Sequence, residues 1–357
     1  MTFKKAVLAY FGAFLFLIVF VPSVFYVSDP YSLFHRPWFH KGEMYKNLRI
    51  QDYGLIKFEQ FDSIIMGTSM LENTSAVEAS EKIGGTYANL SVTGGSFYEK
   101  FLILQFALKT KKISSVILSL DYHFGETKAI RNSFHPELYA GKISGKIKTY
   151  LTGKAVLCTL LRKKCDFIKR TLDRPKAWMN ETEHARRFGG FDNWLKYRKE
   201  DKQIQATLYE MTQDNNDHKQ AYKEYQKVID NEILPLFENT ETSFSLIIPP
   251  YSVFWWVKRK NELKEMMRPY EYLVEKTQNS PNVKIYWFYD DDYVFDISQY
   301  KDLPHYHQSV NSLQLDAIRD GTHILDMNNY KQKIAGFIKR VRAFDTEPYL
   351  RQIRDAK

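Results

Sequence analysis

The sequence predicts a three-layer α/β/α fold with a mainly parallel, flavodoxin-like five-stranded sheet, joined to one N-terminal transmembrane helix. Three observations support this class. The chain begins with a long uncharged apolar stretch, and after Asp62 short apolar runs alternate with segments of helical periodicity. This alternation is typical of parallel sheets covered by helices. With 44% apolar residues among 357, the chain has ample material for a buried core.

The first segment is long enough to cross a bilayer. Residues 6–28 carry no charge, and about 20 apolar residues suffice for a spanning helix. Lys4 and Lys5 precede it, so the positive-inside tendency keeps residues 1–5 in the cytoplasm and exports the rest of the chain. No small-residue cleavage site comes after the apolar stretch, so we expect an uncleaved, single-pass anchor in a bacterial cytoplasmic membrane. The alternative is a buried helix of a soluble protein.

The expected sheet comes from five apolar runs that end in turn-forming residues. We predict strands within residues 62–67, 85–91, 114–122, 243–250 and 282–289. We predict helices at residues 71–83, 95–110, a region ending near 233, 258–277, 308–319 and 328–342. Together they define a domain at residues 62–345.

One long segment interrupts this alternation. Residues 125–217 are basic and aromatic and show no clear strand. The segment is too long for a bare loop, so we expect a helical insertion. It is either a solvated cap or a lid or surface lying against the membrane or a membrane partner. Residues 29–61 are expected to form a collar after the anchor, and residues 346–357 a tail.

The cysteines and the charge exclude some classes of site. Cys158 and Cys165 lie in a stretch that reads as helix, where two turns separate them by about 10 Å, beyond the reach of a disulfide. No His or carboxylate lies at ligand spacing around them, so we expect no metal, and no motif predicts a cofactor. The net charge of +9 suits an anionic membrane or polymer and does not imply nucleic acid.

The stretch "DSIIMGTSML" at residues 62–71 places Ser69 just after the first predicted strand. Parallel sheets bind their ligands beyond the carboxyl ends of the strands, so a hydroxyl here is a candidate nucleophile. The alternative is that Ser69 caps the helix expected from Leu71, a task at which serine is good.

A nucleophilic serine needs a base, and the base needs a group that fixes its tautomer. Two Asp-x-x-His pairs occur near the C-terminus: Asp302 with His305, and Asp320 with His323. The first pair lies closer to the last predicted strand, in a loop expected to reach the rim that carries Ser69. Asp320 and His323 are the runner-up dyad, because Gly321 also makes that stretch a good helix-ending turn.

These features together resemble a known family. The sequence is similar to SGNH/GDSL-type esterases and acyltransferases, and more closely to their membrane-anchored, exported branch, which includes the alginate O-acetylation proteins and the protein that helps load D-alanine onto teichoic acid. The resemblance covers residues 1–124 and 243–340. Its motifs are "IIMGTSM", "YANLSVTGGSFYE", "VILSLDYHF", and "DLPHYHQSVNSLQLDAI" followed by "MNNY".

The resemblance implies a role for each matching residue. Ser69 would be the nucleophile, His305 the general base and Asp302 the group that orients it. The oxyanion hole would use the backbone N–H of Ser69 and of Gly94 or Gly95. The third motif ends in Asp121, where many members of the family supply an asparagine, and Asn89 is the available amide, although it equally suits a turn.

We expect one of three functions. The first is an exported acyltransferase that moves an acyl group, expected to be acetyl, onto or off a cell-surface polysaccharide beside a membrane-bound O-acyltransferase, as the resemblance implies. The second is a polysaccharide-binding or assembly component without activity, which Asp121 and the competing His pair would favour. The third is a simple esterase. Fold alone does not choose among them.

Overall fold

The chain divides into two compact units. The computed structural model describes residues 2–39, 41–125, 134–160, 165–173, 181–213, 222–238 and 241–356. Unit 1 comprises Met1–Gln60, Phe106–Lys111 and Arg131–Thr171, and unit 2 comprises Phe61–Gln105, Lys112–Ile130 and Leu172–Lys357. One helix, α4 (Phe97–Thr110), contributes residues to both.

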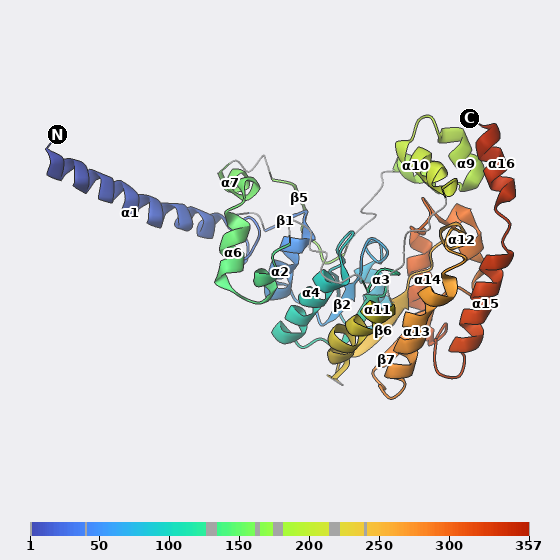
Figure 1. Cartoon of the computed structure of the whole chain (residues 1–357). Helices are drawn as coiled ribbons and strands as arrows, with labels where there is room; N and C mark the ends of the chain where they lie inside the picture. The colour runs from blue at the N-terminus through green and yellow to red at the C-terminus, as the bar shows by residue number, and fades with distance from the viewer. Residues whose placement is uncertain are drawn as a thin grey trace. The chain divides into compact units, whose positions relative to one another are not determined.

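Unit 2 is built on a five-stranded parallel sheet (Figure 1). The strands, in spatial order, are β3 (Tyr87–Asn89), β2 (Ser63–Met66), β4 (Ser115–Ser119), β6 (Ser243–Ile248) and β7 (Val283–Trp287). Each falls inside one of the five apolar runs predicted as strands. The expected mixed α/β class with a parallel sheet is therefore confirmed.

The sheet is buried on both faces, which is why its strands read as continuous apolar runs. On one face Ile65, Ile117 and Ile247 pack with Ala79 of α3 and Leu315 of α14. The neighbouring residues of the same strands point to the other face, because side chains alternate along a strand. They are equally buried, and they include Ile64, Val116, Leu118 and Leu246.

The strand order creates a switch point at the carboxyl edge of the sheet. From β2 the chain crosses to β3 on one side, and from β3 it returns to β4 on the other side of β2. Right-handed crossovers then place the helices α3 and α4 on opposite faces. The carboxyl ends of β2 and β4 border the resulting crevice, which is where open α/β sheets bind ligands.

The helices of unit 2 agree with the prediction in part. Besides α4, they are α3 (Ala76–Ile83), α8 (Glu181–Arg187), α9 (Gly190–Tyr197), α10 (Lys202–Met211), α11 (Tyr222–Val228), α12 (Val253–Val257), α13 (Leu263–Thr277), α14 (Gln308–Asp320), α15 (Tyr330–Ala343) and α16 (Glu347–Asp355). Four short helical turns accompany them: η2 (Ile229–Ile233), η3 (Leu234–Glu238), η4 (Asp292–Phe295) and η5 (Ile297–Gln299). The expected tail at 346–357 is largely α16, whose Ile353 is buried.

Unit 1 joins the predicted collar to part of the predicted insertion. It contains α1 (Phe3–Ser28), α2 (Leu48–Phe58), α5 (Pro136–Tyr139), α6 (Ile143–Tyr150) and α7 (Gly153–Leu160). Strand β1 (Glu43–Tyr45) pairs antiparallel with β5 (Phe167–Lys169). The expectation of no strand within residues 125–217 is therefore wrong, and this segment is divided between the two units. Residues 126–133, 161–164, 174–180 and 214–217 of it lie outside the described part of the chain.

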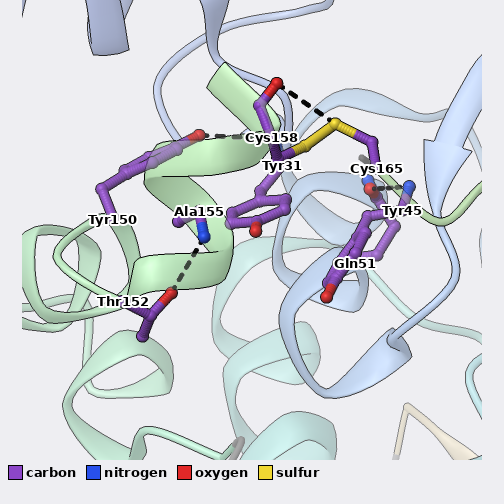
Figure 2. The surroundings of a disulfide bond; sticks show 8 residues. All are labelled: Tyr31, Tyr45, Gln51, Tyr150, Thr152, Ala155, Cys158 and Cys165. Atoms are coloured by element: carbon purple, nitrogen blue, oxygen red, sulfur yellow. Dashed lines mark hydrogen bonds between the residues drawn. A yellow bond between two sulfur atoms is a disulfide. The ribbon is translucent and has the colours of Figure 1, made fainter. Parts of the chain in front are cut away.

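Cys158 and Cys165 form a disulfide, with their Cα atoms 4.8 Å apart. The prediction that they lie too far apart on one helix is wrong because α7 ends at Leu160, so Cys165 is not on it. Figure 2 shows the bond among the aromatic residues of unit 1. The ring of Tyr31 lies 4.5 Å from that of Tyr45 and 5.4 Å from that of Tyr150.

Helix α1 is long and apolar enough to cross a membrane. It has 26 residues with a mean hydropathy of 2.4 over its most apolar window, and none of that window is buried. A soluble helix of this composition would cover its apolar side chains with other parts of the protein. The part of the chain described here leaves them exposed, which favours the anchor over the buried-helix alternative.

Candidate active site

Ser69 lies in a turn just beyond the carboxyl end of β2, at the switch point. Gly67 precedes it where a Cβ atom would lie 2.7 Å from the Leu71 Cβ, so the close return of the chain requires glycine. Helix α3 begins only at Ala76, and its N-cap is Ser75, whose hydroxyl accepts from the Glu78 N–H. The alternative reading of Ser69 as the helix cap is therefore wrong.

A chain of hydrogen bonds joins Ser69 to His305 and Asp302. The Ser69 Oγ lies 2.8 Å from His305 Nε2. The other ring nitrogen, Nδ1, lies 2.8 and 3.0 Å from the two carboxylate oxygens of Asp302. A carboxylate only accepts, so Nδ1 carries the proton and Nε2 is left to accept from the serine hydroxyl.

The loop that carries Asp302 and His305 is held at both ends. Tyr300 and Tyr306 form an antiparallel bridge, and the Lys301 N–H donates to the carbonyl of His305. The His305 N–H also donates to Asp302, at 2.9 Å. The carboxylate therefore fixes both the backbone and the ring of the histidine.

Asp302 is held in its charged form. Burial alone would raise its pKa, but the adjacent His305 and the buried Lys301 lower it below the usual range for aspartate. The side chains of His305 and Asp302 retain 22% and 12% of their exposure. The pair is therefore largely desolvated, and each side chain keeps some exposure.

Two residues that the sequence did not single out hold this loop against the Ser69 turn. The hydroxyl of Tyr306 and the amide of Asn311, at the start of α14, both donate to the Met70 carbonyl at 2.9 Å. Asn311 also donates to the Thr74 hydroxyl. Both lie inside the motif around His305. Their closeness to His305 in the sequence was the only feature that could have indicated a role for them.

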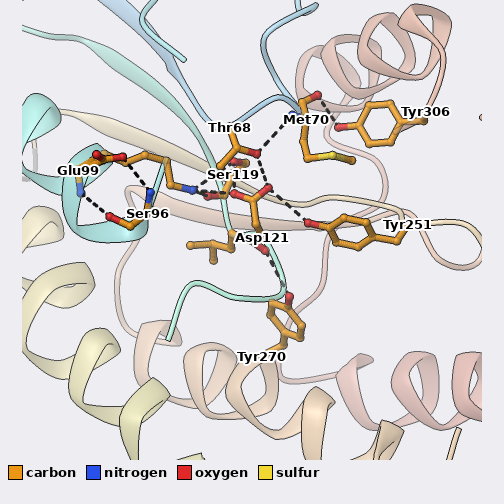
Figure 3. Close-up of polar contacts among 11 residues, drawn as sticks. Thr68, Met70, Ser96, Glu99, Ser119, Asp121, Tyr251, Tyr270 and Tyr306 are labelled. Atoms are coloured by element: carbon orange, nitrogen blue, oxygen red, sulfur yellow. Dashed lines mark hydrogen bonds and ion pairs between the residues drawn. The ribbon is translucent and has the colours of Figure 1, made fainter. Parts of the chain in front are cut away.

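The carboxylate of Asp121 is occupied by hydrogen-bond and ion-pair partners. Figure 3 shows it hydrogen-bonded among Thr68, Ser119 and Tyr251. Its main partner is the buried Lys100, whose Nζ lies 2.7 Å away. Burial alone would raise the pKa of Asp121, but the charges of Lys100 and His123 bring it to about 2. Thr68 comes after β2 and Asp121 after β4, so this contact bridges the switch point beneath Ser69.

The other expected oxyanion residues are Asn89, Gly94 and Gly95. Asn89 is buried, and its amide donates to the carbonyls of Leu71, Glu72 and Thr74, so it shapes the turn after Ser69. The Gly95 N–H donates to the Val92 carbonyl at 2.8 Å. Gly94 has a φ of 57°, in the left-handed region that favours glycine.

The runner-up pair, Asp320 and His323, is not brought together as a dyad. Asp320 is exposed and pairs with Arg319 at 2.7 Å. His323 instead lies 3.2 Å from Asp291 through Nε2, and its ring stacks on Phe288. Sequence spacing alone could not separate the two pairs, because both have the same Asp-x-x-His pattern.

The arrangement contains the parts needed for nucleophilic chemistry: a hydroxyl, an imidazole nitrogen placed to accept from it, and a carboxylate that fixes the imidazole. Among the described residues, no cluster of three or more His, Cys, Asp or Glu side chains is placed to hold a metal ion. Comparison with protein-family models gives no match, and comparison with curated proteins gives none either.

Proposed function

We propose that this chain is a serine acyl-transfer enzyme of the SGNH type. The observation that carries the proposal is the short contact of 2.8 Å between Ser69 Oγ and a histidine whose other nitrogen is fixed by a buried carboxylate. The position of the nucleophile after the first strand of the sheet and of the Asp-x-x-His motif before α14 supports the resemblance to that family.

The proposed reaction has two steps. His305 takes the proton of Ser69 as the hydroxyl attacks the acyl carbonyl, and then gives it to the leaving alcohol. The acyl group remains on Ser69 as an ester. In the second step His305 takes a proton from an acceptor hydroxyl, the acceptor attacks the acyl carbon, and the proton returns to Ser69. Asp302 stabilises the histidine while it is charged in both steps.

The developing oxyanion needs donors aimed at it. We place the first at the Ser69 N–H. The resemblance places the second at the N–H of Gly94 or Gly95, and in this structure the Gly95 N–H donates to the Val92 carbonyl. Asn89 is not part of this proposal, since its amide holds the carbonyls of the Ser69 turn. Backbone donors fixed in this way cost no reorganisation during the reaction.

We further propose that the domain works outside the cytoplasm, anchored by α1 on the outer side of a bacterial cytoplasmic membrane. The disulfide supports export, because such bonds persist in oxidising compartments. The resemblance, with the anchor, supports a cell-surface polysaccharide as acyl acceptor or donor, an acetyl group, and a membrane-bound O-acyltransferase as partner. Nothing in the described part of unit 2 requires nucleic acid.

A direct test is to trap the acyl intermediate. The full chain in detergent would be mixed with p-nitrophenyl acetate and quenched in acid, and its peptides analysed by mass. The proposal predicts one acetyl group on the peptide containing Ser69, and none in Ser69→Ala. A folded wild-type protein that never acquires the acetyl group would contradict it and favour a binding role.

A simple esterase would use the same three residues with water as acceptor, so the trapping experiment does not distinguish an esterase from an acyltransferase. Deleting the gene and measuring the O-acyl content of the surface polysaccharide does distinguish them. An acyltransferase predicts that the surface polysaccharide loses its O-acyl groups, whereas an esterase predicts that it retains or gains them. The two features that favoured a non-catalytic component have other roles: Asp121 pairs with Lys100, and His323 with Asp291.

A further inference from the structure

We propose that the part of unit 1 outside α1 lies in the outer leaflet of the membrane through a set of exposed apolar side chains, here called the seat. Its members are Trp38, Phe39, Ile143, Ile147, Leu151 and Leu157. Their partner would be the acyl chains and headgroup boundary of the bilayer itself. The proposal depends on α1 spanning the membrane and is independent of the role of Ser69.

The seat includes a regular apolar stripe. Ile143, Ile147 and Leu151 succeed one another at intervals of four residues along α6 and its C-cap, so they share one face of the helix. They are 61%, 48% and 73% exposed. An apolar stripe of this kind on a soluble helix faces the protein core, but here it faces away from unit 1.

Exposed apolar residues are concentrated in unit 1. Outside α1, the described part of unit 1 has seven large hydrophobic side chains that are exposed, the seat together with Ile168, whereas the described part of the larger unit 2 has three. Those three are Val77 on α3, Tyr209 on α10 and Met327 in the turn before α15. Single exposed apolar residues are normal, but a concentration marks an interaction surface.

The depth of α1 indicates which partner covers this surface. A helix rises about 1.5 Å per residue, so Phe20 and Val24 lie roughly 21 and 27 Å from Ala6. Both are therefore within the hydrocarbon core, which is about 30 Å thick. These two side chains also line an apolar pocket of about 440 Å³, together with Phe39, Cys158 and Phe167. Phe39, Cys158 and Phe167, which line this pocket from outside α1, must then lie at the level of the lipid.

The seat is tied firmly to the end of the anchor. The ring of Phe25 on α1 lies 5.4 Å from that of Tyr150 on α6, and the Tyr150 hydroxyl donates to Asp29, directly after α1. The disulfide links α7 to the segment before β5. The rest of unit 1 therefore cannot leave the membrane surface without separating from α1.

The charges next to the stripe fit this position. Lys142, the N-cap of α6, and Lys148 on α6 are exposed beside the apolar residues, and Lys148 also pairs with Glu137. Lysines on an interfacial helix extend their ammonium groups to the phosphate level while their stems remain in the apolar layer. A soluble protein partner would not require an apolar stripe flanked by lysines at the level where α1 leaves the membrane.

The test measures lipid contact in the full chain. The sequence contains two cysteines, both in the disulfide, so an added cysteine is the only free thiol. A nitroxide label would be placed at Leu151→Cys and Leu157→Cys in the seat, at Val77→Cys and Met327→Cys as exposed controls in unit 2, and at Leu15→Cys in α1. The labelled proteins would be studied in phospholipid nanodiscs.

Collision rates with oxygen, which concentrates in lipid, and with a nickel chelate, which stays in water, distinguish the outcomes. We expect the seat labels and Leu15→Cys to collide several-fold more with oxygen than with the chelate, and the controls the reverse. Seat labels that behave like the controls while Leu15→Cys stays in lipid would overturn the proposal and leave the anchor intact. Seat labels shielded from both reagents would also overturn it, because protein would then cover the seat. A Leu15→Cys label that collides mainly with the nickel chelate would show that α1 does not span the membrane, and this would overturn the proposal.

Discussion

Asp121 and Asp302 are two buried carboxylates of unit 2 with depressed pKa values, yet their surroundings differ. Asp121 comes after β4 and meets Lys100, and both side chains are 1% exposed. Asp302 comes after β7 and meets His305, and these side chains are 12% and 22% exposed. One pair is sealed inside the fold, and the other ends at a serine hydroxyl.

The difference teaches what a charged pair can do. The Asp121–Lys100 pair is sealed from solvent, so it can only hold structure. A histidine takes up and releases a proton near neutral pH, so the Asp302–His305 pair can take part in a reaction. The sealed pair fixes Thr68 through Asp121, and thereby supports the residue that precedes Ser69.

The largest expected effect is at the open site. Ser69→Ala should lower the rate of ester cleavage by roughly 10⁴-fold or more, because the nucleophile is lost. The measurement is turnover of p-nitrophenyl acetate. The matched control is Ser75→Ala, six residues on, which removes a helix cap at a cost of about 1 kcal/mol in stability but should keep its activity. Equal activity of Ser69→Ala and Ser75→Ala would contradict the assignment.

The orienting carboxylate should show the next effect. Asp302→Asn is expected to lower kcat by about 10³- to 10⁴-fold, because an amide can favour the wrong histidine tautomer. Asp320→Asn, the corresponding change in the runner-up pair, should leave kcat within about twofold, because Asp320 contacts Arg319 at the surface. Loss of kcat in Asp320→Asn instead would transfer the role to the second pair.

The sealed pair should instead respond in stability. Lys100→Met leaves the Asp121 charge buried without its main partner, and we expect a loss of roughly 3–5 kcal/mol in the free energy of unfolding. The double variant Lys100→Met/Asp121→Leu should lose clearly less, because no charge then remains buried. The free energy of unfolding of each variant can be measured by hydrogen exchange of the β4 amides in micelles. A double variant less stable than the single one would show that the pair is not a unit.

A smaller effect should appear with pH. The pKa of Asp121 is about 2 in the folded state and about 3.9 in an unfolded chain. Its contribution, roughly 2–3 kcal/mol at about 1.4 kcal/mol per pKa unit, is therefore present above pH 4 and lost as the pH falls toward 2. Asp302 contributes in the same direction. Exchange of the β4 amides between pH 6 and 3 should show the decline, reduced in the double variant. An equally steep decline in that variant would contradict this account.

Local patterns predicted the sheet well because each strand is a short apolar run buried on both faces. The triad residues could be proposed because Ser69, Asp302 and His305 each come after a strand or before a helix in a fixed order. The sequence could not show that Lys100 neutralises Asp121, since 21 residues and a crossover separate them. It also misplaced the start of α3 and missed the disulfide, because both depend on where a helix ends or begins.

The insertion was harder to predict for a physical reason. Strand β5 has only three residues and pairs with β1, more than 120 positions earlier. The strand is mostly exposed, so it forms through that pairing and not through a local run of buried apolar residues. Propensity cannot reveal a strand whose stability comes from such distant contacts.

The most direct test of the central claim is labelling of the full chain with a fluorophosphonate, which reacts only with an activated serine. Wild type would be compared with Ser69→Ala, His305→Ala and His323→Ala, and the labelled peptide identified by mass. We predict labelling on Ser69 in the wild type and in His323→Ala, and none in the other two. A folded wild-type protein that stays unlabelled, or labelling that survives His305→Ala and disappears in His323→Ala, would contradict the account.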